Sequence, residues 1–148
     1  PCLNTLAKNL KLACSMLGEH QIQPVFEMIN GTDMPRFLVQ NIAQAQEMLE
    51  AVQNPALKMQ YDCYHMAMMG EEVFEALKEN IHDIGHIQFA DCPGRHEPDT
   101  AQINFAEIFQ WLNQSTYTGY TAAEYRPQSH SNHSFAWKDK YFVKHPQS

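Results

Sequence analysis

Apolar residues recur along the chain with two alternating periods, one typical of helices and one of strands. Stripes in which an apolar side chain returns every three or four residues predict five helices, at residues 4–20, 37–52, 71–82, 105–112 and 134–142. Short runs bounded by turn-forming residues predict four intervening strands, at residues 22–29, 57–65, 84–90 and 120–126. Strict alternation with short connections predicts an α/β fold with a parallel sheet. We expect residues 1–148 to form a single domain.

Each predicted strand carries one side chain with a ligand oxygen near its carboxyl end: Glu27, Asp62, Gln88 and Glu124. When these four are placed on one face of the sheet, the alternation of side chains leaves a mostly apolar opposite face. The carboxyl ends of parallel strands meet at one edge, so we expect the four to converge. Four oxygen ligands suit a hard divalent cation, Mg²⁺ or Mn²⁺. Any single one of the acids is equally well explained as a solvated strand end or a helix cap.

Two further polar residues follow these positions closely, and each has two interpretations. His65 lies three residues after Asp62, and Arg95 lies in the loop after Gln88. Both are candidate substrate-binding residues, because arginine makes bidentate contacts with carboxylates. His65 could instead position the metal ligands. Arg95 could instead form a surface ion pair with an acid of its own loop, Glu97 or Asp99.

Three other residues are interpreted as structural. His86 lies on the same strand face as Gln88, and we expect a hydrogen-bonded interior histidine. Cys63 and Cys92 flank the predicted site, where we expect them to act as small packing residues.

Composition narrows the possible classes of partner. A formal net charge of -7 argues against nucleic-acid binding, which requires a clustered basic surface. The sequence contains no apolar run near the roughly 20 residues of a membrane span, so we expect no membrane insertion. The four cysteines have no CxxC spacing, which favours reduced thiols and a cytoplasmic location.

Four stretches of the chain carry a family resemblance: FEMIN with DMPRF (26–37), LKMQYDCYHM (57–66), GHIQFADCPGRHEPD (85–99) and GYTAAEYRPQ (119–128). They resemble the hydroxypyruvate isomerase family, within the xylose-isomerase-like TIM barrels. The resemblance implies a (β/α)₈ barrel, of which this chain is the last four β/α units preceded by one helix, with the N-terminal half absent.

The resemblance also implies a reaction, a metal-dependent interconversion of hydroxypyruvate and tartronate semialdehyde through an enediolate. It implies that Glu27, Asp62, Gln88 and Glu124 hold the metal. Glu27 and Glu124 would also be the acid/base pair, with His65 and Arg95 in the substrate-binding positions. The alternatives are a 2-oxo-tetronate isomerase or a ketose 3-epimerase of the same superfamily, or a non-catalytic half-barrel module.

The length of the chain raises the question of a partner. A TIM barrel needs roughly 250 residues, against 148 here. An isolated half would leave the strands at 22–29 and 120–126 as open edges, which invite pairing with another strand. Besides a small hydroxy-keto acid substrate, we therefore expect a homo-oligomer or pairing with a missing N-terminal half.

Overall fold

The structure is a computed structural model that describes residues 1–142; the last six residues of the predicted domain lie outside the described range. Helices and strands alternate as the sequence predicts, with one additional helix directly after the second strand. In chain order the elements are α1 (Cys2–Gly18), β1 (Val25–Glu27), α2 (Ile42–Val52), β2 (Lys58–Asp62), α3 (Cys63–Met68), α4 (Val73–Asn80), η1 (Ile81–Asp83), β3 (Ile84–Phe89), α5 (Phe105–Gln114), β4 (Tyr120–Ala123), η2 (Ser131–His133) and α6 (Ala136–Tyr141).

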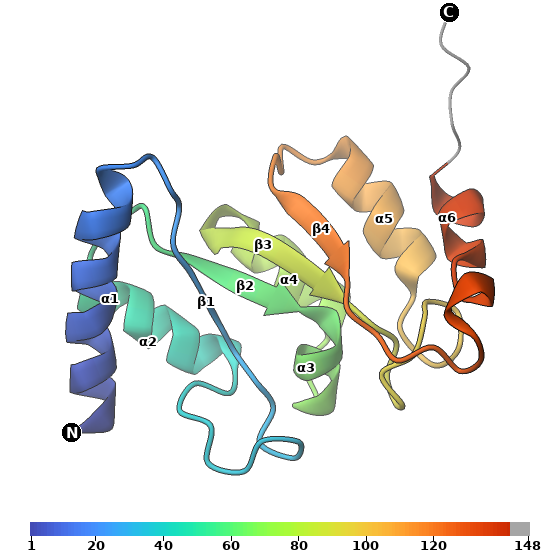
Figure 1. Cartoon of the computed structure of the whole chain (residues 1–148), viewed down its shortest axis with the longest axis horizontal. Helices are drawn as coiled ribbons and strands as arrows, with labels where there is room; N and C mark the ends of the chain where they lie inside the picture. Colours follow the sequence, from blue (N-terminus) through green and yellow to red (C-terminus); the bar gives the residue numbers. More distant parts are fainter. Residues whose placement is uncertain (143–148) are drawn as a thin grey trace, which may run out of the picture.

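The four strands form one sheet in the order β1-β2-β3-β4, and every neighbouring pair is parallel (Figure 1). Glu27 pairs with Gln60 in register, and Asp62 pairs with Gln88. The predicted parallel α/β fold is therefore confirmed. Sequential strand order with all carboxyl ends at one edge is the arrangement of one part of a β/α barrel.

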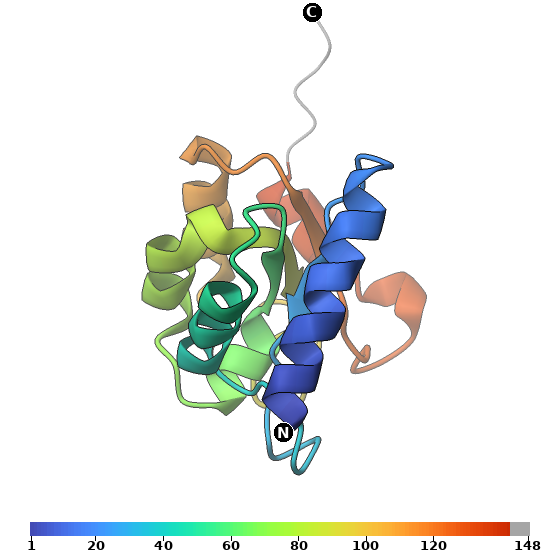
Figure 2. The ribbon, with the colours of Figure 1, turned by 90° about the vertical axis from the view of Figure 1, so that its left-hand side faces the viewer.

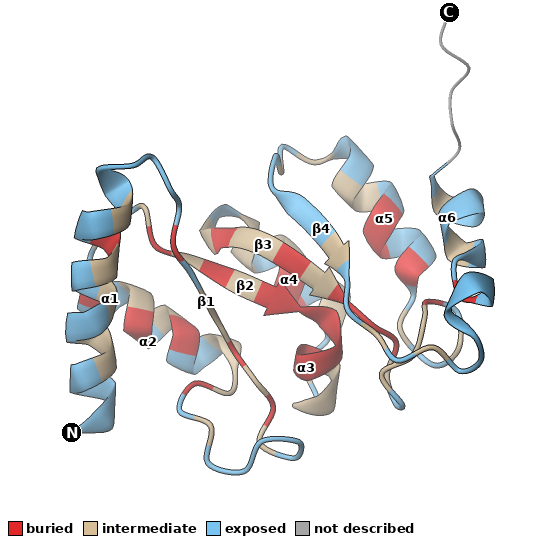
Figure 3. Ribbon diagram, in the orientation of Figure 1, coloured by how far each residue is buried: buried red, intermediate tan, exposed pale blue. Residues whose placement is uncertain are grey.

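One face of the sheet is covered by helices and the other is open. Helices α2, α3, α4 and α5 lie behind the sheet in Figure 1, and they lie on the left of the turned view in Figure 2. On β2 and β3 the side chains that face them include Met59, Tyr61 and Ile87, which are fully buried. On the opposite face Gln60 and Gln88 are only half-buried, which gives the alternating bands along the strands in Figure 3. The predicted division into an apolar and a polar face is confirmed for β2 and β3.

All four strands are shorter than predicted, and β2 ends three residues before its predicted boundary. The predicted strand at 57–65 ends at Asp62, because the Oδ1 atom of Asp62 accepts a hydrogen bond from the Tyr64 N–H at 2.9 Å and caps α3. An N-cap of this kind satisfies a helix N–H that otherwise has no partner. His65 consequently lies on a helix, not on a strand. The backbone of Glu124 lies just beyond β4 but still donates a hydrogen bond to Phe89 O at 3.1 Å.

The loop after β3, residues 90–104, is organised by one buried carboxylate. Asp91 is fully buried. Its side chain accepts hydrogen bonds of 2.8–3.0 Å from four backbone N–H groups of the loop, those of Cys92, Thr100, Ala101 and Ile103. These bonds fold the loop back on itself and fix the segment that carries Arg95.

The last two helices pack against each other, and both contact Phe89 of β3. At the start of α5 the Asn104 side chain accepts a hydrogen bond from the Glu107 N–H at 3.4 Å and caps the helix. Helix α6 then places Trp137 against Phe89 and Phe109, with ring centroids 5.2 and 6.5 Å apart. Among residues 1–142, no helix combines the length and apolarity that crossing a bilayer requires.

Candidate active site

The carboxyl ends of the strands surround a pocket of about 480 Å³. Its lining comes from β1, from the loop after it, from α3 and from the segments after β3 and β4. Charged and polar side chains dominate this lining, and they include Glu27, Asp33, His65, Arg95 and Glu124. Four of the six site residues predicted from the sequence therefore lie around one space. The other two, Asp62 and Gln88, are attached to it through hydrogen bonds and close contacts.

Asp62 uses its two carboxylate oxygens for different purposes. Oδ1 caps helix α3, as described above, so the helix-cap interpretation is correct for this acid. Oδ2 faces the site, 3.5 Å from the Arg95 guanidinium and 3.7 Å from His65 Nε2. Asp62 is fully buried. The cap thus fixes the direction in which the second oxygen points.

Glu27 and Asp62 form the acidic centre of the site. The pKa of Glu27 is raised to about 7, mainly by burial and also by the neighbouring charges of Asp62 and Glu124. Burial also raises the pKa of Asp62 to about 6. Arg95 lowers both pKa values, but one guanidinium does not compensate three carboxylates. The site therefore carries an excess of negative charge.

Arg95 is a cation of the pocket that contacts its acids, and these partners differ from the two acids of its own loop. Its guanidinium pairs with the Glu124 carboxylate at 2.8 Å. The alternative of a surface pair with Glu97 or Asp99 is wrong: Asp99 pairs with Lys140 at 2.9 Å, and Glu97 accepts a backbone N–H. The reason is the folding of the loop by Asp91, which turns Arg95 toward the strand ends.

Gln88 is linked to the site through Gln60, a residue of the same strand face. The Gln60 Nε2 atom donates to Gln88 Oε1 at 2.6 Å. A hydrogen bond from Gln60 also lowers the pKa of Glu27, against the larger effect of burial. Sequence reasoning gave Gln60 no role. Its position two residues before Asp62 on one strand was the available signal.

The loop after β1 supplies site residues that sequence reasoning missed. Asn30 and Asp33 were interpreted only as part of a break after the first strand and of a family-like stretch. Asn30 is fully buried and its amide Nδ2 lies 2.7 Å from His65 Nδ1. Asp33 accepts a hydrogen bond from the Tyr64 hydroxyl at 2.8 Å. Asparagine and aspartate with turn residues between them were the only hint in the sequence.

His65 is neutral in this environment. Burial lowers its pKa to about 4, and the nearby positive charge of Arg95 acts in the same direction. Its Nε2 atom lies 3.8 Å from Glu27 Oε1 and 3.7 Å from Asp62 Oδ2. His65 therefore presents an uncharged ring between the two acids of the site.

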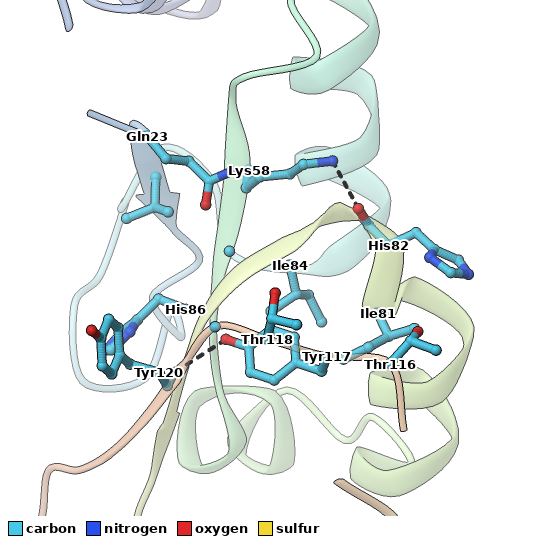
Figure 4. Close-up of a pocket in the computed structure, with 13 residues that line it drawn as sticks. Gln23, Lys58, Ile81, His82, Ile84, His86, Thr116, Tyr117, Thr118 and Tyr120 are labelled. Atoms are coloured by element: carbon cyan, nitrogen blue, oxygen red, sulfur yellow. Dashed lines mark hydrogen bonds between the residues drawn. The ribbon is translucent and has the colours of Figure 1, made fainter. Parts of the chain in front are cut away.

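A second and larger hollow, of about 650 Å³, lies at the amino ends of the strands (Figure 4). His86 lines it and is half-buried, so the expectation of an interior histidine is wrong. The face toward which His86 points has no covering layer in the described part of the chain. The polar groups drawn there serve the fold: Lys58 Nζ donates to His82 O at 2.7 Å, and the Tyr117 hydroxyl donates to Tyr120 O at 3.1 Å. We assign no chemistry to this hollow.

The donor set at the carboxyl ends fits a hard divalent cation. One ligand atom each from Glu27, Asp62 and His65 lies within 4.8 Å of the others. Glu124 joins this group through Arg95, and Gln88 joins it through Gln60. Buried carboxylates with raised pKa values are groups whose mutual repulsion a cation would relieve. The assignment of Glu27, Asp62, Gln88 and Glu124 as metal ligands remains a prediction.

The raised pKa of Glu27 predicts an unusual pH dependence of stability for the metal-free chain. Between about pH 4.5 and pH 7 the folded state keeps a proton on Glu27 that the unfolded state has lost. Because the folded state binds more protons, its free energy of unfolding falls as the pH rises through this window. Glu27→Gln removes this loss, so urea unfolding should show the variant more stable than the wild type at pH 8 and similar at pH 4.5. Glu75→Gln, on an exposed helical site, should track the wild type throughout. If the difference in free energy of unfolding between Glu27→Gln and the wild type does not grow as the pH rises, the prediction is contradicted.

Comparison with known proteins places this geometry in a family. The family model described as xylose isomerase-like TIM barrel matches residues 1–141. The chain is 37% identical to hydroxypyruvate isomerase of Escherichia coli over 137 residues, which are 93% of this chain and 53% of that protein. It is 33% identical to a 2-oxo-tetronate isomerase of Cupriavidus necator over 140 residues, 95% of this chain and 54% of that protein. The chain thus spans about half the length of the curated relatives it matches.

Solved structures agree with the assignment of the fold. The crystal structure of a family 2 AP endonuclease from Brucella melitensis superimposes with a TM-score of 0.89 at 28% identity, covering 95% of this chain and 54% of that one. A 3-keto-D-glucoside 4-epimerase from Escherichia coli has a TM-score of 0.80 at 20% identity, over 93% of this chain and 53% of that one, and shows the fold alone. The chain belongs to the xylose isomerase-like TIM barrel family, of which it forms a parallel half-barrel.

Proposed function

We propose that this chain carries the catalytic strand ends of an isomerase that interconverts hydroxypyruvate and tartronate semialdehyde. The observation that supports it most is the convergence of three carboxylates, Glu27, Asp62 and Glu124, with Arg95 and His65 at one pocket. The 37% identity to a hydroxypyruvate isomerase over nearly the whole chain supports the substrate class. A non-catalytic half-barrel has no need for buried acids with raised pKa values.

In this proposal a divalent cation, Mg²⁺ or Mn²⁺, is held by Glu27, Asp62, Gln88 and Glu124. When bound, such a cation stabilises negative charge on the substrate oxygens and acidifies the neighbouring C–H group. Glu124 is paired with Arg95 in the structure. This contact uses Oε2 of Glu124, so Oε1 would remain for the cation, and Arg95 keeps further N–H groups for an anionic group of the substrate.

Two glutamates move the proton that the isomerisation requires. Of Glu27 and Glu124, one takes a proton from the hydroxyl-bearing carbon of hydroxypyruvate, which leaves an enediolate. A glutamate returns a proton to the neighbouring carbon, which was the ketone, while the hydroxyl proton moves between the two oxygens. One C–H bond breaks and another forms, so that neither oxidant nor reductant is needed. The strands that carry the two glutamates hold the planar intermediate between them.

Arg95 and His65 bind and orient the substrate. Arg95 can make a bidentate contact with the substrate carboxylate, because its planar guanidinium matches that group. His65 lies between Glu27 and Asp62 and is neutral, so it contributes a hydrogen bond without adding charge. Together they place the two reacting carbons beside the glutamates.

A second substrate, 2-oxo-tetronate, has support from the 33% identity to the Cupriavidus necator protein. It needs the same proton transfer between neighbouring carbons on a molecule one carbon longer. Substrate profiling in D₂O with Mn²⁺ decides between them: turnover should incorporate deuterium at the newly protonated carbon of the preferred acid. A preference for free ketoses over both hydroxy-keto acids would favour a ketose 3-epimerase and overturn the proposal.

Because the sheet edges are open, the assay has to compare this chain alone with a completed barrel. Strands β1 and β4 each have one side without a strand partner in the described chain, and Val25 and Tyr120 are exposed there. We infer that four further β/α units, the half that relatives possess beyond the matched segment, complete the barrel in the active protein. The assay should therefore be run on this chain alone and after mixing with that half of the Escherichia coli relative. Activity that appears only on mixing, with 1:1 co-sedimentation, supports this inference; equal activity of the self-associated chain overturns it.

A further inference from the structure

The amide group of Asn30 is buried beside the active site with every polar atom engaged. Asn30 has no exposed surface. Its Oδ1 atom accepts hydrogen bonds from the backbone N–H groups of Thr32 at 3.1 Å and Asp33 at 2.8 Å. A backbone N–H can only donate, so the amide oxygen has to face these two groups. The orientation of the amide is therefore fixed, and its nitrogen is turned toward the site.

The two hydrogens of Asn30 Nδ2 have two acceptors. One is Asp33 Oδ2 at 3.0 Å, and the other is His65 Nδ1 at 2.7 Å. The backbone N–H of Asn30 also points at the same His65 nitrogen, at 3.4 Å. Both groups that face His65 Nδ1 are donors, so this nitrogen has to accept. A neutral imidazole whose Nδ1 accepts carries its proton on Nε2.

We propose that Asn30 is a positioning residue that fixes His65 in the tautomer with its proton on Nε2. The Nε2–H group then lies between two acids, 3.8 Å from Glu27 Oε1 and 3.7 Å from Asp62 Oδ2. A protonated nitrogen donates to an oxygen and does not coordinate a cation. His65 is therefore not a metal ligand, although it is one of the three residues with close ligand atoms. It acts instead as a hydrogen-bond donor to a substrate oxygen held between Glu27 and Asp62. This consequence rests on the proposed function, whereas the tautomer itself does not.

The test replaces Asn30 by its isostere. Asn30→Asp keeps an oxygen for the Thr32 and Asp33 N–H groups but presents an acceptor, not a donor, to His65 Nδ1. The proton of His65 should move to Nδ1, or the ring should become doubly protonated, with the population of the Nε2–H tautomer falling by about tenfold or more. Histidine ring ¹⁵N–¹H correlation spectra of the metal-free chain report the tautomer directly. The His65 signals are identified by their loss in His65→Gln.

Two further variants test whether hydrogen bonding by residue 30 or the local negative charge controls the His65 tautomer. Asp33→Asn removes a nearby negative charge but keeps an acceptor for Asn30, and its spectrum should keep the wild-type tautomer. The double variant Asn30→Asp with Asp33→Asn has the wild-type net charge, and it should still show the shifted tautomer. A double variant with the wild-type tautomer would show that charge, not the amide, controls His65, and would overturn the proposal.

The wild-type spectrum tests the position of the His65 proton even if the variants fail to fold. A proton found on His65 Nδ1 in the folded wild type overturns the proposal, since Asn30 then faces it with two donors. An Nε2–H tautomer in a barrel that turns over none of the hydroxy-keto acids would refute the proposed reaction and leave the role of Asn30 intact.

Discussion

Replacing Glu27 or Glu124 with glutamine is expected to lower isomerase turnover by about 10²–10⁴-fold, the range that positioned acid/base groups contribute. Glutamine keeps the shape and an oxygen of the side chain, but it can neither take a proton from carbon nor return one. Both glutamates reach the same pocket from opposite edges of the sheet. The two single variants should therefore lose activity to a similar degree, and the double variant should lose little more than either of them.

The measurement is the rate of hydroxypyruvate isomerisation in the assembly that is active, with Mn²⁺ in excess. Because the same residues are predicted metal ligands, occupancy has to be checked by titrating Mn²⁺ until the rate no longer rises. Glu75→Gln provides the control, since this exposed glutamate on α4 pairs with Lys78 and does not line the pocket. Near-normal turnover by both saturated variants would remove the acid/base assignment.

The pattern of apolar residues was sufficient for the fold because it is a local signal repeated in every element. Each helical stripe and each strand run could be identified separately, and their alternation left few topologies. The boundary of β2 was wrong for a local reason as well. In LKMQYDCYHM the β-prone tyrosines extend the strand pattern, while the Asp62 cap that ends the strand depends on one side-chain hydrogen bond. Capping of this kind competes with strand propensity at the site where Asp62 is also needed for chemistry.

The alternation of side chains along the strands predicted the site residues that lie on strands, but not those that lie on loops. Parity placed Glu27, Asp62 and Gln88 on one face, and the parallel sheet brought them to one edge. Strand alternation cannot predict contacts made by loops, because loop geometry is not periodic. The pairing of Arg95 with Glu124 depends on the Asp91 carboxylate folding residues 90–104. The contact of Asn30 with His65 joins residues 35 positions apart in the chain, across two elements.

Two substitutions of Asp62 are expected to distinguish its effect on metal binding from its effect on stability. In Asp62→Asn the Tyr64 N–H still needs an acceptor, so the amide oxygen takes the place of Oδ1 and the amide nitrogen takes the place of Oδ2. A donor then faces the space where a cation would bind. Mn²⁺ affinity should fall by more than about 100-fold, beyond the 10–100-fold typical of residues that only support ligands. The cap survives, so the melting temperature of the metal-free chain should be unchanged or higher.

Asp62→Ala should lose both properties. Without the cap, helix α3 loses about 0.5–2 kcal/mol, which for a chain of this size lowers the melting temperature by roughly 2–4 °C per kcal/mol. Calorimetric titration with MnCl₂ and thermal melts followed by circular dichroism measure the two effects. Asp83→Asn is the control, because this acid lies at the amino end of β3, away from the site. If Asp62→Asn binds Mn²⁺ as the wild type does, Asp62 is a helix cap and not a metal ligand. If it loses Mn²⁺ while keeping the wild-type melting temperature, the second oxygen of this carboxylate is the one the site requires.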